Sequence, residues 1–256
     1  MSGKIQLLIR SDDLGYSEAV NHGIHKVLRY GMTRSIGVMT NMPAAQHGFD
    51  LIRDLPVCVG QHTNICVGTP VCDPAQVPSL CRADGSFKTS REYRTAPQDF
   101  VVFEEAVLEI EGQYRRFKEL TGREPDYFEG HAIRSANFIR ALEFVAQKHG
   151  LKYSGMVMPG QTMPVGTAEV DRLPMNSMDP AYDAVQSIKD AVLAARTDMP
   201  NLYVCHPGYV DAELLNTSTL TINRAKEVAM LCDPAVQNWL EENGVELVSY
   251  ADVGNA

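Results

Sequence analysis

The sequence predicts an α/β fold, a TIM-barrel-like (β/α) barrel of about seven mainly parallel strands, either complete or incomplete and distorted. Short apolar runs alternate along the 256 residues with amphipathic helical patterns. This alternation favours parallel strands joined by right-handed helical crossovers. Several of the runs end on an ionisable residue, and barrel enzymes place their sites at such strand ends. We expect one domain over residues 1–256, with rim insertions at about 63–98 and 158–180.

The first half of the chain contributes three expected strands, at 5–10, 34–39 and 57–62. Between them, Ser17 caps a helix that Gly31 ends, and Asn41 and Pro43 open a short helix reaching Ile52. The segment 63–97 has no helical period, and Asp84-Gly85 predicts a tight turn within it, with a small hairpin.

The second half alternates in the same way. Strands are expected at 125–131, 152–157, 201–206 and 245–249. Helices are expected from an Asp99 cap to Gly122, from Phe138 to Gly150, from an opening at Asp179-Pro180, over about 221–231, and after an Asp233 cap. The residues 158–178 have no clear period and are predicted to form a loop.

Composition excludes several functions. A net charge of −9 offers no basic face for nucleic acid or an anionic membrane. No apolar run is long enough to span a bilayer, and no leader precedes the first strand, so a cytoplasmic location is expected. The six cysteines form no Cys-x-x-Cys pair and are expected to be free thiols. No Gly-x-Gly-x-x-Gly or Walker loop is present, which argues against nucleotide binding.

Five ionisable residues stand at the expected carboxyl ends of strands: Asp12, Asp13, His62, His131 and His206. In a parallel barrel these ends share one face, so the five side chains should converge. Each of them alone has an ordinary explanation, because acids often cap helices and a histidine after a strand is often a hydrogen-bonded boundary residue.

Their chemistry nevertheless indicates a metal site. Adjacent carboxylates repel each other unless a cation lies beside them. One aspartate with two histidines is a usual ligand set for a catalytic divalent ion, and imidazole ligands suit Zn²⁺, Mn²⁺, Co²⁺ or Fe²⁺ better than Mg²⁺. Asp12 as base, the metal as electrophile and His206 as acid would together hydrolyse an amide or an ester.

At these residues the chain resembles the YdjC-like carbohydrate deacetylase family. The matching pieces, in the family's order, are Ser11–Ser17 followed by Val20–Ile24, then Gly60–Asn64, then Glu129–His131, then Cys205–Gly208. The resemblance implies removal of the N-acetyl group from amino-sugar mono- or oligosaccharides. It also implies one divalent metal, Mg²⁺ or Zn²⁺ with Mn²⁺ or Co²⁺ as further choices, and a homodimer.

Carried over by position, the resemblance assigns the metal to Asp13, His62 and His131. Asp12 becomes the general base, and His206 the acid or a donor on the oxyanion side. Three further residues are expected to bind substrate, namely Arg10, Asn21 and Arg134.

The chain also departs from the family. Further histidines usually follow the position of His131, whereas Ala132, Ile133 and Arg134 stand here, and Gln61 occupies a commonly apolar position. Arg134 could bind an anionic group of the substrate, or be a surface arginine that starts a helix. Two other functions stay open: a metal-dependent phosphoesterase with two ions, and an inactive barrel that binds a sugar.

Overall fold

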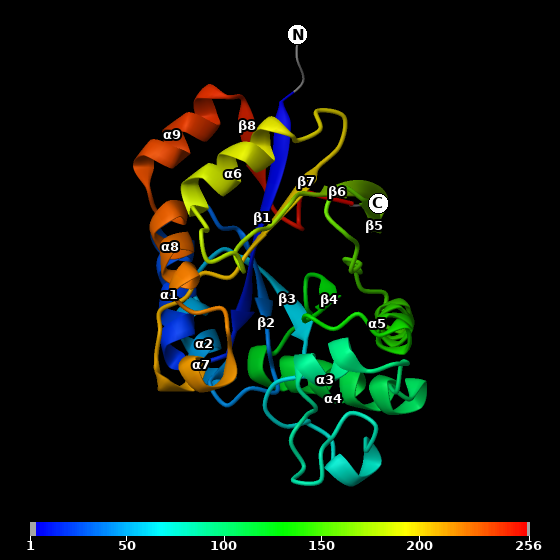
Figure 1. Cartoon of the computed structure of the whole chain (residues 1–256). Coiled ribbons are helices and arrows are strands. Elements are labelled where there is room, and N and C mark those ends of the chain that lie inside the picture. The colour runs from blue at the N-terminus through cyan, green and yellow to red at the C-terminus, as the bar shows by residue number, and fades with distance from the viewer. Residues whose placement is uncertain (1–3, 255–256) are drawn as a thin grey trace.

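A computed structural model describes residues 4–254 and shows a strongly curved, mostly parallel sheet (Figure 1). The strand order is β4-β3-β2-β1-β7-β6-β5, and β8 pairs with β1. Only β5 runs antiparallel to its neighbour, β6. The strands are β1 (Ile5–Leu14), β2 (Ser35–Val38), β3 (Cys58–Thr63), β4 (Phe128–Gly130), β5 (Thr162–Val165), β6 (Ala168–Arg172), β7 (Asn201–Cys205) and β8 (Val245–Val248).

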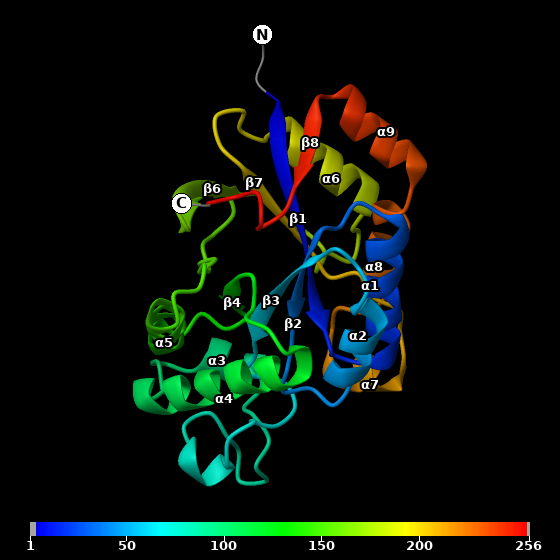
Figure 2. The same ribbon diagram turned by 180° about the vertical axis from the view of Figure 1, so that it is seen from behind.

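The sheet forms an incomplete barrel, which is one of the two forms that the sequence predicted. Its two edges, β4 and β5, do not pair with each other in the described part of the chain. The segment after α5 (Ala136–Lys148) lies beside β4, where Ser154 N donates to Phe128 O at 2.8 Å. The central strand β1 pairs with β8 through its first half and with β2 through its second half. Figure 2 shows this arrangement from behind.

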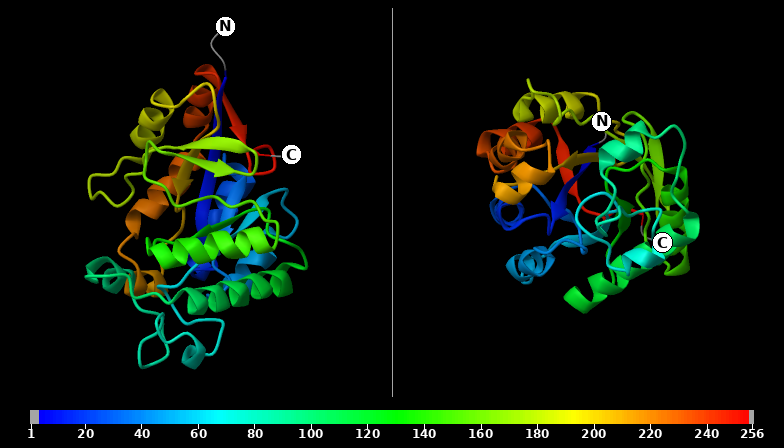
Figure 3. Two further views of the ribbon diagram at one scale, coloured as in Figure 1. Left: turned by 90° about the vertical axis from the view of Figure 1, so that its right-hand side faces the viewer. Right: turned by 60° about the horizontal axis from the view of Figure 1, so that its bottom comes forward.

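Helices surround the outside of the sheet (Figure 3). They are α1 (Glu18–Tyr30), α2 (Ala45–Ile52), α3 (Ser90–Thr95), α4 (Phe103–Thr121), α5 (Ala136–Lys148), α6 (Ala184–Leu193), α7 (Ala212–Thr217), α8 (Ile222–Leu231) and α9 (Pro234–Glu242), with a 3₁₀ turn at Pro74–Gln76. Ser17 caps α1 by accepting from Val20 N, and Asp233 caps α9 by accepting from Ala235 N, as predicted. No helix within residues 4–254 is long and apolar enough to cross a membrane.

Side chains fill the lower interior of the barrel, beneath the carboxyl ends of the strands. Tyr127 and Tyr250 stack with their ring centroids 3.7 Å apart, and Leu8, Leu202 and Val204 pack in the same cluster. This apolar plug closes the barrel below the polar residues of β1. The polar residues therefore form the floor of a cavity that opens at the carboxyl ends of the strands.

The expected starts of α4 and α6 are wrong. Asp99 does not cap α4, whose first turn begins only at Phe103 and has no side-chain cap. The carboxylate of Asp99 instead accepts from Ser135 Oγ at 2.8 Å and from Asn137 N at 3.1 Å, and so ties the preceding segment to α5. Likewise α6 starts at Ala184 under an Asp183 cap rather than at Asp179-Pro180. A nearer capping acid or a tertiary partner prevails over the local signal in each case.

The strand expected at 152–157 is also wrong, because only Tyr153 makes a bridge, to Phe128. The loop predicted at 158–178 instead contains the β5–β6 hairpin, whose two-residue turn is Gly166-Thr167. Gly166 has a φ of +59°, which the turn requires. The sequence signal for this strand was the alternation in which Met163 and Val165 are apolar, and these two side chains are the buried ones. Helix α2 starts at Ala45 rather than at Asn41 and Pro43, so that expectation is wrong as well. Helices α3 and α7 were not predicted.

Candidate metal and catalytic site

A bulge in β1 brings two consecutive aspartates to one site. Side chains alternate along a strand, so Arg10 and Asp12 face the barrel interior while Asp13 should face outward. The pairing of β1 with β2 shifts register between Ser11 and Leu14, and Asp13 has a φ of +78°. This left-handed conformation, which aspartate tolerates better than most residues, turns Asp13 towards the two histidines.

Three ligand atoms converge at this point. Asp13 Oδ1 lies 3.2 Å from His62 Nε2 and 3.2 Å from His131 Nδ1. The two imidazole nitrogens are 2.9 Å apart. Although buried, Asp13 Oδ1 has no hydrogen-bond partner of suitable geometry among the described residues. An acceptor oxygen and two imidazole nitrogens that face one another need a cation or shared protons between them.

The spacing fits a divalent ion. Ligands at about 2.1 Å from a cation lie about 3.0 Å apart at octahedral angles and about 3.4 Å apart at tetrahedral angles. The three separations here, 2.9, 3.2 and 3.2 Å, fall in or next to this interval. The donor set of one carboxylate and two imidazoles suits Zn²⁺ and its neighbours and leaves positions open for water and substrate. These residues therefore fit a catalytic divalent metal.

Two charged side chains hold the ligands in place. Glu129 Oε1 is hydrogen-bonded to His62 Nδ1, the nitrogen that faces away from Asp13. Arg224, on α8, donates from Nη2 to Asp13 Oδ2 at 2.7 Å. Partners of this kind orient metal ligands and fix the tautomer of a histidine. Sequence reasoning assigned neither residue. Glu129 could have been found, because it lies two residues before His131 in the same short motif.

The charges around the ligands shift their pKa values. Burial alone would raise the pKa of Asp13, but the guanidinium of Arg224 and the two histidines hold it well below its usual range. Burial alone would lower the pKa of His62, yet Glu129 and Asp12 raise it to about 9. In the metal-free chain a proton therefore occupies the place of a metal on His62 at neutral pH.

Asp12 forms a two-pronged ion pair with Arg10. Arg10 Nη2 donates to Asp12 Oδ2 at 2.8 Å, and Arg10 Nε lies 2.8 Å from Oδ1. Arg10 also lies 3.4 Å from Glu129 Oε2 and donates to Tyr250 OH at 3.3 Å. Gly37 on β2 leaves room for these groups, since a Cβ there would stand 2.8 Å from Asp12 Oδ1. Arg10 lines the cavity, but its charge is already matched by two carboxylates.

His206 follows β7, on the opposite side of β1 from the two other histidines. Its backbone N–H donates to the buried carboxylate of Glu227 at 2.5 Å. Its Nδ1 is buried and has no hydrogen-bond partner among the described residues. Burial lowers the pKa of His206 to about 4 against the opposing effect of Asp13 and Asp12, so the ring is neutral at pH 7.

A cavity of about 680 Å³ joins these groups. It is lined by the five strand-end residues together with Arg10, Arg134 and residues from the segments 89–94 and 175–178. Arg134 is exposed at the rim and donates to Val157 O at 3.3 Å. Asn21 does not line the cavity. It is fully buried, with Oδ1 accepting from Gly15 N at 2.6 Å and Nδ2 donating to Ala44 O, so it braces the turn after the aspartates.

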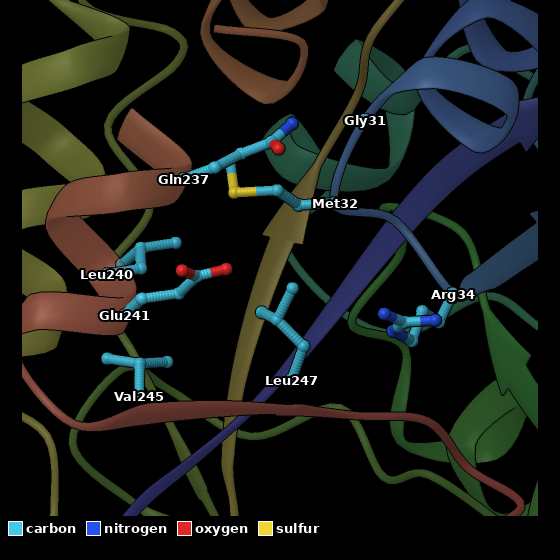
Figure 4. Close-up of a pocket in the computed structure, with 8 residues that line it drawn as sticks. All are labelled: Gly31, Met32, Arg34, Gln237, Leu240, Glu241, Val245 and Leu247. Carbon is cyan, nitrogen blue, oxygen red and sulfur yellow. The ribbon is translucent and has the colours of Figure 1, made fainter. Parts of the chain in front are cut away.

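A second, smaller cavity of about 270 Å³ lies at the amino-terminal ends of β2 and β8, beside α9 (Figure 4). Met32, Leu240 and Leu247 supply apolar walls, and Arg34 and Glu241 are its charged groups. Parallel barrels carry catalysis at the opposite end, so the larger cavity is the candidate active site.

Comparison with known proteins shows the family of this chain. The family model described as YdjC-like protein matches residues 6–242. The chain belongs to the YdjC-like family. Carbohydrate deacetylase 2 of Listeria innocua is 29% identical, with 97% of this chain and 99% of the relative covered. Chitooligosaccharide deacetylase of Enterobacter sp. (strain 638) is 28% identical, with 96% and 98% covered.

Solved structures share the fold. A protein of Enterococcus faecalis V583, provisionally named a cellobiose-phosphate cleavage protein, superposes with a TM-score of 0.80 at 21% identity and covers 98% of this chain and 99% of that one. A family 4 acetyl xylan esterase of Clostridium thermocellum, solved with a cobalt ion, gives a TM-score of 0.54 at 12% identity, with 96% and 89% covered. Both structures share the fold of this chain.

Proposed function

We propose that this YdjC-like protein is a metal-dependent hydrolase that removes the N-acetyl group from amino-sugar mono- or oligosaccharides. The observation that carries the proposal is the convergence of Asp13, His62 and His131 on one point, with Asp12 beside them in the same cavity. The names of the relatives, carbohydrate and chitooligosaccharide deacetylases, supply the substrate class.

Each residue has a role in the proposed reaction. Asp13, His62 and His131 would hold one divalent cation, Mg²⁺ or Zn²⁺, or else Mn²⁺ or Co²⁺. When bound, such an ion polarises the acetyl carbonyl and lowers the pKa of water. Asp12 accepts the proton of the attacking water, and Arg10 fixes the orientation of its carboxylate.

His206 acts from the other side of β1. As a neutral imidazole it presents an N–H as a hydrogen-bond donor to the carbonyl oxygen. In the alternative role, as the acid that protonates the departing amine, it must first take up a proton and act as the imidazolium. Its backbone hydrogen bond to Glu227 fixes the chain at the end of β7, where the ring enters the cavity.

A two-metal phosphoesterase has less support. Asp12, His62 and Glu129 also bring ligand atoms within 4.8 Å of one another. Arg10, however, already lies 2.8 Å from Asp12 and 3.4 Å from Glu129, so a second cation would face a fixed positive charge. An inactive sugar-binding barrel is separated from the enzyme by whether acetate is released.

The single domain over 1–256, the cytoplasmic location and the homodimer are part of the same proposal. They follow from the sequence and from the family resemblance. Light scattering of the purified chain at micromolar concentration tests the dimer, with a mass near twice 28.3 kDa as the expected result.

The decisive experiment measures acetate release and metal content together. The metal-loaded protein should release acetate from N-acetylated sugars. His62→Ala should lose both metal and activity, whereas Asp12→Asn should keep the metal and lose at least about a hundredfold in turnover, as expected for a general base. His22→Ala and Asp54→Asn, at exposed positions, are the matched controls. An Asp12→Asn variant with normal turnover would exclude Asp12 as the base.

A further inference from the structure

Arg172, at the end of β6, differs from the other arginines of the cavity. Arg10 and Arg224 are paired with carboxylates, and the rim arginines, such as Arg94, are exposed to solvent. Arg172 is half-buried and lines the cavity. Within residues 4–254, no carboxylate oxygen lies within 4.0 Å of its guanidinium, which donates only to Leu173 O, at 3.3 Å.

An enclosed guanidinium without an anion is unfavourable. Burial and the nearby charge of Arg10 lower the pKa of Arg172 to about 10, so it is still a cation at neutral pH. Loss of hydration is compensated only by an opposite charge or by a full set of hydrogen bonds. The carboxylates that face this cavity are Asp12, Asp13 and Glu129, and the other two buried arginines already bind them. The guanidinium of Arg172 is therefore available to an anionic group of a ligand in the cavity.

The surroundings of Arg172 define the size and nature of that anion. Arg172 is in register with Leu202 on β7, and both side chains line the cavity. Val204, two residues further along, faces the same cavity, and both apolar residues are almost completely buried. A cation next to a small apolar wall is complementary to a short carboxylic acid, with its carboxylate on the guanidinium and its alkyl group on the wall.

We propose that Arg172, Leu202 and Val204 form the subsite for the acetyl group, and that Arg172 binds the carboxylate of the acetate produced. The inference rests on the proposed deacetylase function. Hydrolysis breaks the amide C–N bond and forms a C–O bond to the oxygen of water. One proton of that water is transferred to the nitrogen to complete the amine, and the other leaves the acetic acid and protonates the amine, so that the products are acetate and an ammonium group. The acetyl group gains a negative charge only in this reaction. Arg172 therefore interacts more strongly with the product than with the neutral substrate.

The test measures the binding of acetate itself. NMR of ¹³C-labelled acetate, titrated with the metal-loaded protein, gives the affinity. Arg172→Met should weaken acetate binding at least tenfold, and Arg172→Lys should fall between Arg172→Met and the wild type. Arg94→Met, at the exposed rim, is the matched control and should bind like the wild type. Metal content and circular dichroism of each variant show that the site and the fold are intact.

The apolar wall gives a second, independent arm. Val204→Ala removes two methyl groups from the wall and so enlarges the space for the alkyl group of the acid. Propionate should therefore gain at least threefold in affinity relative to acetate. Val192→Ala, a buried valine of the outer core, controls for general loosening and should leave the ratio unchanged. Inorganic phosphate is the competing probe. An Arg172-dependent preference for phosphate over acetate would overturn the proposal, because the arginine would then serve a phosphorylated substrate.

An unchanged affinity of Arg172→Met for acetate would also overturn the proposal. Neither result depends on turnover, so the subsite and the proposed function can fail separately. A wild-type protein that releases no acetate from any N-acetylated sugar refutes the function, whereas an acetate-releasing enzyme whose Arg172 does not affect acetate binding refutes only the subsite.

Discussion

Arg224→Met should destabilise the metal-free protein far more than the same substitution at an exposed arginine. The guanidinium lies on α8, 2.7 Å from Asp13 Oδ2, and both side chains are almost completely buried, at 3% and 0% exposure. Removing one partner of a buried ion pair costs about 3–5 kcal/mol when the other charge is left unpaired. Here the protonated His62, 3.2 Å from Asp13 Oδ1, still faces the carboxylate, so the loss should lie at the lower end of this range. Methionine retains much of the volume of arginine, so most of the loss reports on the charge rather than on a cavity.

Urea unfolding at pH 7 in the presence of a chelator measures this loss. Asp13 has a depressed pKa in the folded state, so its contribution is present above its unfolded pKa, about 3.9, and is lost as pH falls through the folded value. The difference between wild type and variant should therefore shrink below about pH 4. Arg29→Met, an exposed arginine of α1, should change stability by less than about 0.5 kcal/mol. A loss below about 1 kcal/mol for Arg224→Met, or one independent of pH, would refute the reasoning.

Three further predictions concern the metal and its surroundings. Glu129→Gln removes the charged partner of His62 and should lower metal affinity about 10–100-fold, as measured by competition with a chromogenic chelator. The apparent metal affinity of the wild type should fall as the pH drops below about 9, because the metal must replace the proton on His62. The fall should be about tenfold per pH unit for each imidazole proton that the metal displaces. A flat profile from pH 6 to 9 would contradict this. Gly37→Ala places a Cβ 2.8 Å from Asp12 Oδ1 and 2.9 Å from Glu129 Oε1, so turnover on an N-acetylated sugar should drop at least tenfold while circular dichroism stays unchanged.

The strands β1, β2, β3, β4 and β7 could be predicted because each is a short run that is buried over most or all of its length. The strand ends then placed Asp12, His62, His131 and His206 around one cavity, where the structure has them. The β5–β6 hairpin was missed because its strands are half-exposed at the edge of the sheet and carry Pro164, which weakens the apolar signal.

The supporting residues of the site were less accessible from the sequence. Arg224 meets Asp13 across 211 positions and belongs to a helix whose pattern shows no special feature. The bulge that turns Asp13 inward was not visible either, since alternation along β1 predicts the opposite orientation. Asn21 was expected to bind substrate because of its place in a family motif. Its side-chain amide instead accepts a hydrogen bond from Gly15 N and donates one to Ala44 O.

The central claim is that one cation binds between Asp13, His62 and His131. Anomalous diffraction from crystals grown with Zn²⁺, Mn²⁺ or Co²⁺ tests it most directly. The geometry predicts a single strong peak about 2.0–2.3 Å from Asp13 Oδ1, His62 Nε2 and His131 Nδ1, with Asp12 beside it and unbound. A peak elsewhere, two peaks 3.5–4 Å apart, or no peak with saturating metal would contradict the proposed single-metal site.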